Sequence, residues 1–215
     1  MQTTANSFSE PEANVSTAGT VSSITTHYTQ RLPAHGFDAR SPAMTAKLAR
    51  YLTAWWTGYG STGKPHRGMV LSGSVGSGKS VAARAMQHLT GALWLDSEKM
   101  AELYRNCGED KARFWEQTLP VPYTGERPRP CRVAILDDLG SEPTVNDFGN
   151  KLEVCGEWIV RRYRDWQEFG LEATTIITTN LQRTDVQARY GDRIESRLSE
   201  MAWWIETDGK DWRKV

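Results

Sequence analysis

The sequence predicts an α/β protein built on a mainly parallel sheet of five strands with helices on its faces. Short apolar segments, typical of buried strands, alternate along the chain with longer segments of helical spacing. One of these strands, residues 133–137, is apolar until its last residue, as expected for a sheet that is covered on both faces. A glycine-rich turn ending in Lys79 and Ser80 joins the first strand to its helix.

The composition is that of an ordinary globular chain. Of 215 residues, 39% are hydrophobic and 24% are charged, which allows one domain with a sizeable core. Lys and Arg together number 26, as do Asp and Glu, so the formal net charge is zero. This balance argues against a dedicated nonspecific DNA-binding protein, and contacts with nucleic acid must come from local patches.

The cysteines and the N-terminal segment indicate the cellular compartment. Cys107, Cys131 and Cys155 are widely spaced and odd in number, which argues against a disulfide framework or a metal site. Residues 1–20 have no basic start and no apolar run, and no segment is apolar and long enough to span a bilayer. We therefore expect a cytoplasmic protein with reduced thiols and no membrane contact.

The chain begins with a segment that we do not expect to fold by itself. Residues 1–30 are poor in large apolar residues, and we interpret them as a tail that is disordered or binds a partner. Ser41 and Pro42 then predict the start of a helix that runs to about Trp55. The folded domain is expected to cover residues 31–215.

The elements of the sheet follow in alternation. We expect Ser97 to be the N-cap of its helix, and we expect the longest helix to end before Gly170. Residues 120–130 are rich in proline and predict a loop. The expected strands are 68–72, 92–96, 133–137, 174–179 and 203–206, and the expected helices are 79–90, 97–105, 147–169 and one or two within 184–200.

The turn from Gly73 to Ser80 reads GSVGSGKS and fits the pattern G-x-x-x-x-G-K-[ST] between a strand and a helix. Its glycines let the backbone wrap a phosphate chain, and the N–H groups of the helix N-terminus face the anion. Lys79 would reach the β- and γ-phosphates, and the Ser80 hydroxyl would bind Mg²⁺. A chance glycine-rich turn is the alternative interpretation. The predicted phosphate-binding residues are Gly73, Ser74, Val75, Gly76, Ser77, Gly78, Lys79, Ser80 and Val81.

Two acids end the strand at 133–137. A parallel sheet binds ligands at the carboxyl edge of its strands, which is where Asp137 and Asp138 are expected. Asp137 would hold the Mg²⁺ shell, and Asp138 would polarise the attacking water. When these two residues are considered alone, the alternative interpretation is a pair of exposed surface aspartates after a strand.

Polar residues after the later elements extend this prediction. Asn180 directly follows TTIITT and could orient the water or contact the γ-phosphate, although a turn-forming asparagine is the alternative. Arg193 and Arg197 are four residues apart and share one face of a helix. One of them could reach the ATP of a neighbouring subunit as an arginine finger. The alternative is that both pair with acids on a solvated face, the candidates being Asp192, Glu195 and Glu200.

These motifs, in this order, resemble the AAA+ ATPases. Within them, the chain is most similar to the DnaC-type helicase loaders of bacteria and phages and to the IstB-type ATPases of transposition. The resemblance covers residues 31–213. It rests on five stretches that resemble the phosphate loop, the second strand, the Walker B strand, the sensor-1 strand and the loader ending: GMVLSGSVGSGKSVAARAM, LWLDSEKMAELY, VAILDDLGSE, TTIITTNL and YGDRIESRLSEMAWWIETDGKDWR.

The resemblance implies a P-loop NTPase fold of the AAA+, ASCE type, without the C-terminal helical lid of most AAA+ proteins. It also implies ATP and Mg²⁺ as cofactors and subunits that assemble with ATP at their interfaces. Many relatives carry Glu where this chain has Asp138, and the shorter carboxylate lies farther from the water, so we expect slow ATP hydrolysis. The implied roles are Asn180 as sensor 1, Arg197 as the better arginine-finger candidate with Arg193 beside it, and Arg213 as sensor 2.

Three functions follow from these expectations. The first is a helicase loader that assembles with ATP and places a replicative ring helicase on single-stranded DNA in a bacterial or phage-infected cell. The second is an IstB-type regulator that assembles on duplex DNA and recruits a transposase, against which the neutral net charge argues mildly. The third is a nucleotide-gated protein adaptor with little hydrolysis, which Asp138 supports.

Overall fold

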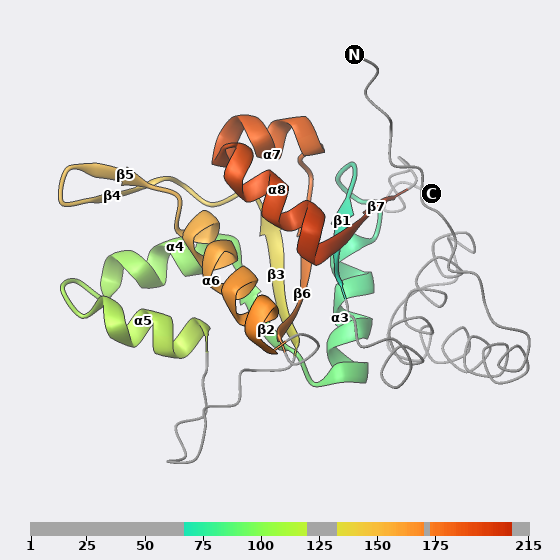
Figure 1. Ribbon diagram of the computed structural model, residues 1–215, viewed down its shortest axis with the longest axis horizontal. Helices are drawn as coiled ribbons and strands as arrows, with labels where there is room; N and C mark the ends of the chain where they lie inside the picture. The colour runs from blue at the N-terminus through green and yellow to red at the C-terminus, as the bar shows by residue number, and fades with distance from the viewer. Residues whose placement is uncertain (1–66, 120–132, 170–172, 208–215) are drawn as a thin grey trace, which may run out of the picture.

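The computed structural model describes residues 67–119, 133–169 and 173–207, and the structural statements below concern these ranges (Figure 1). The expected tail, the helix after Ser41, the proline-rich loop, Cys131 and Arg213 lie outside them.

Five parallel strands form the sheet, which confirms the predicted fold class. The order across the sheet is β2-β3-β6-β1-β7, and every neighbouring pair is parallel. This order places β6, the strand that precedes Asn180, between β1 and β3. On one side of β6 lies the strand before the glycine-rich turn, and on the other lies the strand that carries the two aspartates. The strands are β1 (Gly68–Ser72), β2 (Leu93–Asp96), β3 (Val133–Leu139), β6 (Thr174–Thr179) and β7 (Ala202–Glu206).

Helices cover both faces of this sheet. In Figure 1, α3 lies on one side of the strands, and α4, α6 and the pair α7 and α8 lie on the other. Of the one or two short helices predicted within 184–200, two are present, α7 and α8. The helices are α3 (Lys79–Thr90), α4 (Ser97–Asn106), α5 (Lys111–Thr118), α6 (Val154–Phe169), α7 (Arg183–Tyr190) and α8 (Asp192–Met201).

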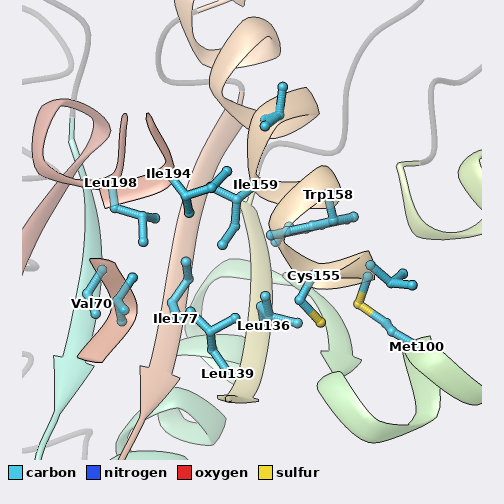
Figure 2. Packing of buried hydrophobic residues seen from close by; sticks show 14 of the residues in the cluster. Val70, Met100, Leu136, Leu139, Cys155, Trp158, Ile159, Ile177, Ile194 and Leu198 are labelled. Carbon is cyan, nitrogen blue, oxygen red and sulfur yellow. The ribbon is translucent and has the colours of Figure 1, made fainter. Parts of the chain in front are cut away.

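Each face of the sheet has its own apolar core, because successive side chains of a strand point to opposite faces. Met69 and Leu71 of β1 pack in the core on the α3 side, whereas Val70 between them packs in the other core. Figure 2 shows this second core, to which β6 contributes Ile177 and α6 contributes Ile159 and Trp158. Burying one such side chain completely contributes about 1.5–3 kcal/mol.

A β-bulge changes the alternation at the end of β3. The register with β6 shifts between Leu136 and Leu139, and Asp138 has a φ of 56°, which is unusual for a residue with a side chain. The extra residue returns Leu139 to the core that already contains Leu136 (Figure 2). The bulge therefore places two consecutive aspartates at the carboxyl edge of the sheet.

The prediction of a helix over 147–169 is wrong at its N-terminal end. Residues 145–152 form a β-hairpin, β4 (Val145–Asp147) and β5 (Asn150–Leu152), and α6 begins at Val154. The two tip residues, Phe148 and Gly149, have φ values of 49° and 86°, which is the backbone of a two-residue type I′ turn. The turn chemistry of the segment DFGN outweighs its helical spacing.

Two smaller differences concern the α4 region. Helix α5 was not predicted. The N-cap of α4 is Asp96 and not Ser97, because the extended Asp96 carboxylate accepts a hydrogen bond from the Lys99 N–H at 3.0 Å. The Ser97 hydroxyl instead donates to the Asp138 carbonyl oxygen at 2.7 Å. Among the helices described, none is both long and apolar enough to cross a membrane.

Candidate nucleotide-binding site

The glycine-rich turn joins β1 to α3, and its glycines have the backbone that the motif requires. Gly76 and Gly78 have φ values of 82° and 87°, in the left-handed region where residues with a Cβ are strained. Gly73 is restricted by contact as well, because a Cβ added there would lie 2.0 Å from the Thr207 hydroxyl oxygen. Thr207 follows β7 and donates to Ser77 Oγ at 2.7 Å and to the Ser72 carbonyl at 3.1 Å. The edge strand β7 thus holds the start of the turn in place.

The N-terminus of α3 is open to an anion. Its N-cap is Gly78, which has no side chain to cap the helix, and the first turn contains no acidic residue. The first N–H groups of a helix have no partner within the helix, and the helix dipole favours negative charge there. A Cβ added at Gly78 would meet no atom within 4 Å, so there is room beside these N–H groups. The residues present therefore fit a phosphate chain.

Lys79 is buried within this turn, with 5% of its surface exposed. Its ammonium group donates to the carbonyl oxygens of Gly73 at 2.9 Å and Ser74 at 2.7 Å, and to Ser77 Oγ at 3.3 Å. These contacts hold the ammonium group of Lys79 against the backbone of the glycine-rich turn. The Ser80 side chain is half-buried one residue further along the helix.

The two aspartates of β3 are held by a threonine of the neighbouring strand. The Thr178 hydroxyl donates to Asp137 Oδ1 at 2.6 Å and accepts a hydrogen bond from the Asp138 N–H at 2.8 Å. Thr178 is fully buried, whereas the two aspartates are half-buried. One side chain therefore fixes a carboxylate and the backbone of the strained residue beside it.

Asp138 lies in an environment that disfavours its charged form. Burial raises the pKa of its carboxyl group, the negative charge of Asp137 raises it further, and the positive charge of Lys79 lowers it. The turn that carries Lys79 and the end of β3 lie at the same edge of the sheet, because Thr179 of β6 is aligned with Ser72 of β1 and with Leu139 of β3. The carboxyl edge of the sheet thus combines the open helix N-terminus with two carboxylates.

Asn180 also lies at this edge. It directly follows Thr179, which is aligned with Ser72 of β1 on one side and with Leu139 of β3 on the other. The Asn180 side chain is exposed, and the hydrogen bonds that shape its turn come from Thr179, whose hydroxyl donates to the Leu139 carbonyl at 2.6 Å. Asn180 is therefore placed between the glycine-rich turn and the acidic strand, and its side chain is accessible to a ligand.

A buried ionic network holds the segment after Asp138. The Glu142 side chain is completely buried, and its carboxylate accepts from the Gly140 N–H at 2.8 Å and from the Tyr190 hydroxyl. Arg189 donates to the Gly140 and Glu142 carbonyl oxygens and forms an ion pair with Glu153 at 3.1 Å. These contacts connect the turn after the aspartates to the end of α7, immediately before α8.

The structure does not bring Arg193 and Arg197 to the glycine-rich turn of the same chain. Both belong to α8, where Arg193 is exposed and Arg197 is half-buried. The guanidinium of Arg197 lies 5.2 Å from the ring centre of Tyr163 on α6. An action of these arginines on a nucleotide would therefore require a site on another molecule.

Sequence reasoning missed the residues that support the site. Thr178, Ser97 and Thr207 act through single hydroxyl groups, and the available signal was a polar residue within or just after an apolar strand. The network of Glu142 and Arg189 joins residues 47 positions apart and has no pattern in the sequence.

No protein-family model and no curated protein matches this chain. Among solved structures, a DNA replication initiation factor is similar at a TM-score of 0.50 and 14% identity, covering 77% of this chain and 46% of that one. AMPPCP-bound DnaA from Aquifex aeolicus is similar at a TM-score of 0.50 and 15% identity, covering 80% of this chain and 49% of that one. The chain thus spans about half the length of these structures.

At this level of identity, the comparisons establish the fold. The five-stranded parallel sheet flanked by helices is the fold that this chain shares with these structures, and it is the one that the resemblance to AAA+ P-loop NTPases implies.

Proposed function

We propose that this protein binds ATP with Mg²⁺ and hydrolyses ATP slowly as a DNA replication helicase loader. The proposal is carried by one observation. The open N-terminus of α3, with Lys79 beside it, lies at the same sheet edge as Asp137 and Asp138. The loader-like ending of the sequence and the likeness to a DNA replication initiation factor support the choice of process.

The residues divide the work as follows. Backbone N–H groups of the glycine-rich turn and the Lys79 ammonium bind the phosphates, for which Lys79 leaves the carbonyl oxygens that it contacts now. Ser80 and Asp137 would hold Mg²⁺, which supplies charge neutralisation at the phosphates when bound. Asp138 and Asn180 orient the attacking water, and Arg197 of a neighbouring subunit stabilises the transition state.

The experiment that tests this proposal measures ATP turnover and assembly state together, with and without single-stranded DNA. We expect ATP to drive assembly and DNA to alter turnover. We expect Arg197→Ala to assemble with ATP but to lose hydrolysis about 10³-fold or more, as for other arginine fingers. Lys79→Ala should lose nucleotide binding. A wild type that stays monomeric and is unaffected by either substitution refutes the proposal.

The loader role needs a second assay, because the ATPase chemistry does not distinguish the three candidate functions. We expect the ATP-bound protein to bind a replicative ring helicase and to release it after hydrolysis. ATP-dependent assembly on duplex DNA with capture of a transposase would favour the IstB-type function instead. If Lys79→Ala retains full partner binding, the protein is a scaffold in which nucleotide plays no part.

A further inference from the structure

The turn that follows Asp138 is held by side chains from distant parts of the chain. The Asp138 carbonyl oxygen accepts a hydrogen bond from the Ser97 hydroxyl at 2.7 Å. Two residues later, both backbone groups of Gly140 have side-chain partners, because its N–H donates to Glu142 at 2.8 Å and its carbonyl oxygen accepts from Arg189. The left-handed backbone of Asp138, with a φ of 56°, is thus over-determined by its surroundings, which is a feature that clusters at functional sites.

Glu142 is the centre of these contacts. Its side chain is completely buried, and its two carboxylate oxygens have different partners. Oε2 accepts from the Gly140 N–H, whereas Oε1 accepts from the Tyr190 hydroxyl and lies 3.5 Å from Nη2 of Arg189. A buried ion pair adds little net stability, because lost hydration offsets the attraction of the charges, but its hydrogen bonds fix geometry. The network is therefore better suited to placing this turn than to stabilising the fold.

The same turn contacts the one that contains Asn180. A Cβ added at Gly140 would lie 2.6 Å from Cδ1 of Leu181, so the two turns are in close contact. The Thr179 hydroxyl joins them as well, because it donates to the Leu139 carbonyl at 2.6 Å and accepts from the Leu181 N–H at 3.0 Å. The backbone on both sides of Asn180 is thus tied to the backbone that follows the aspartates.

Helix α7 completes this connection. It begins shortly after Asn180, and its last two residues, Arg189 and Tyr190, contact Glu142 beside the turn after Asp138. Arg189 is itself held by an ion pair of 3.1 Å with Glu153, which directly precedes α6. The two turns therefore have a common support at both ends of α7.

We propose that Glu142 and Arg189 are positioning residues for ATP hydrolysis, which hold Asp138 and Asn180 at the separation that the attacking water requires. The inference deepens the proposed function and rests on it, because it concerns the same site. Both residues act through the backbone of Gly140 and have no role in binding phosphate. Their loss should therefore slow hydrolysis and leave nucleotide binding to the glycine-rich turn intact.

The first experiment compares two tyrosine variants of the full chain. Tyr190→Phe removes the hydroxyl that donates to Glu142, and Tyr104→Phe removes the hydroxyl that donates to Asp147 at 2.8 Å. Each variant loses one hydrogen bond from tyrosine to a carboxylate, but Asp147 belongs to the hairpin strand β4 and not to the turn after Asp138. We expect both variants to melt below the wild type and only Tyr190→Phe to lower kcat.

The second experiment removes charge from the network while keeping its shape. Glu142→Gln retains an oxygen that can accept from the Gly140 N–H but loses the negative charge that faces Arg189. We expect kcat to fall about 10- to 100-fold, because a displacement of about 1 Å at the reacting groups has effects of this size. Binding of a fluorescent ATP analogue should not change. Arg189→Lys should retain more kcat than Arg189→Ala, because lysine keeps the charge without the planar fork.

Hydrogen exchange provides a readout that needs no nucleotide. The Gly140 N–H donates to Glu142, and the Leu181 N–H donates to Thr179 in the neighbouring turn. We expect Glu142→Gln to speed exchange of both amides while the amides of β1 stay as protected as in the wild type. A uniform rise in exchange across the sheet would show a general loss of stability and would overturn the inference.

The remaining outcomes separate the inference from the proposed function. If the wild type hydrolyses ATP, equal kcat values for Tyr190→Phe and Tyr104→Phe overturn the inference alone. The same holds if Glu142→Gln loses ATP binding as strongly as turnover. If the wild type does not hydrolyse ATP, the proposed function fails and the inference fails with it. Should Glu142→Gln not fold, Tyr190→Phe still decides, because it keeps both charges of the network.

Discussion

The hydroxyl group of Thr178 should be essential to both stability and turnover, and Thr178→Val removes it with almost no change in shape. The substitution leaves the Asp138 N–H without its acceptor at 2.8 Å and Asp137 without its donor at 2.6 Å. An unsatisfied buried group costs about 1–3 kcal/mol, and a hydrogen bond to a charged group contributes about 1.5–3 kcal/mol. Because both contacts belong to one buried side chain, we expect the free energy of unfolding to fall by about 2–4 kcal/mol.

Chemical denaturation and thermal melting measure this change, with Thr178→Ser as the control that keeps the hydroxyl group. For a chain of this size, about 1 kcal/mol corresponds to 2–4 °C, so Thr178→Val should melt about 4–16 °C below the wild type. Its kcat should fall more than its ATP affinity, because the aspartates lose their support while the glycine-rich turn is untouched. A melting temperature of Thr178→Val equal to that of Thr178→Ser would refute the reasoning.

Three further predictions follow from single contacts. Gly73→Ala should lose ATP binding and melt lower, because its Cβ would lie 2.0 Å from the Thr207 hydroxyl oxygen; nucleotide titration and melting check this, and unchanged binding contradicts it. Tyr104→Phe should lower the free energy of unfolding by about 1 kcal/mol at pH 8, because the Tyr104 hydroxyl donates to Asp147 at 2.8 Å. Burial first, and then this hydrogen bond, raises the pKa of Tyr104 to about 12. The contribution of the Tyr104 hydroxyl to the free energy of unfolding is therefore complete below pH 10 and is lost as the pH rises to about 12. Urea denaturation at several pH values should show the difference in free energy of unfolding between the wild type and Tyr104→Phe shrinking over that range. Asp138→Asn should keep ATP binding and lose at least about 100-fold in turnover, as expected when a general base is removed, and equal turnover would assign the base elsewhere.

Much of the fold was readable from the sequence because its signals are local. Strand β1, helix α3 and strand β6 have the predicted bounds, since an apolar run or a glycine-rich turn marks each end. The hairpin at 145–152 was not readable in this way. The left-handed backbone of Phe148 leaves no signal in the spacing of apolar residues, so the segment from residue 147 onward was assigned to the following helix.

In the candidate site, too, some residues could be identified from the sequence and others only from the fold. The motif GSVGSGKS and the two aspartates specify which residues gather at the sheet edge, because parallel strands end on the same side. The bulge at Asp138 and the Thr178 hydroxyl, which set the position of those aspartates, depend on how β3 and β6 pair.

The sequence by itself determined the order of the five sheet strands along the chain and the chemistry of the glycine-rich turn, because neighbouring residues encode both. Only the tertiary structure decided which charges are paired. Arg193 and Arg197 have acids close by in the sequence, yet those acids bind Arg183, Gln187 and Tyr163. Tyr163, which lies within a run of arginines on α6, meets Arg197 of α8 through the packing of the two helices. Pairing depends on distance in space, and for these residues the fold sets that distance.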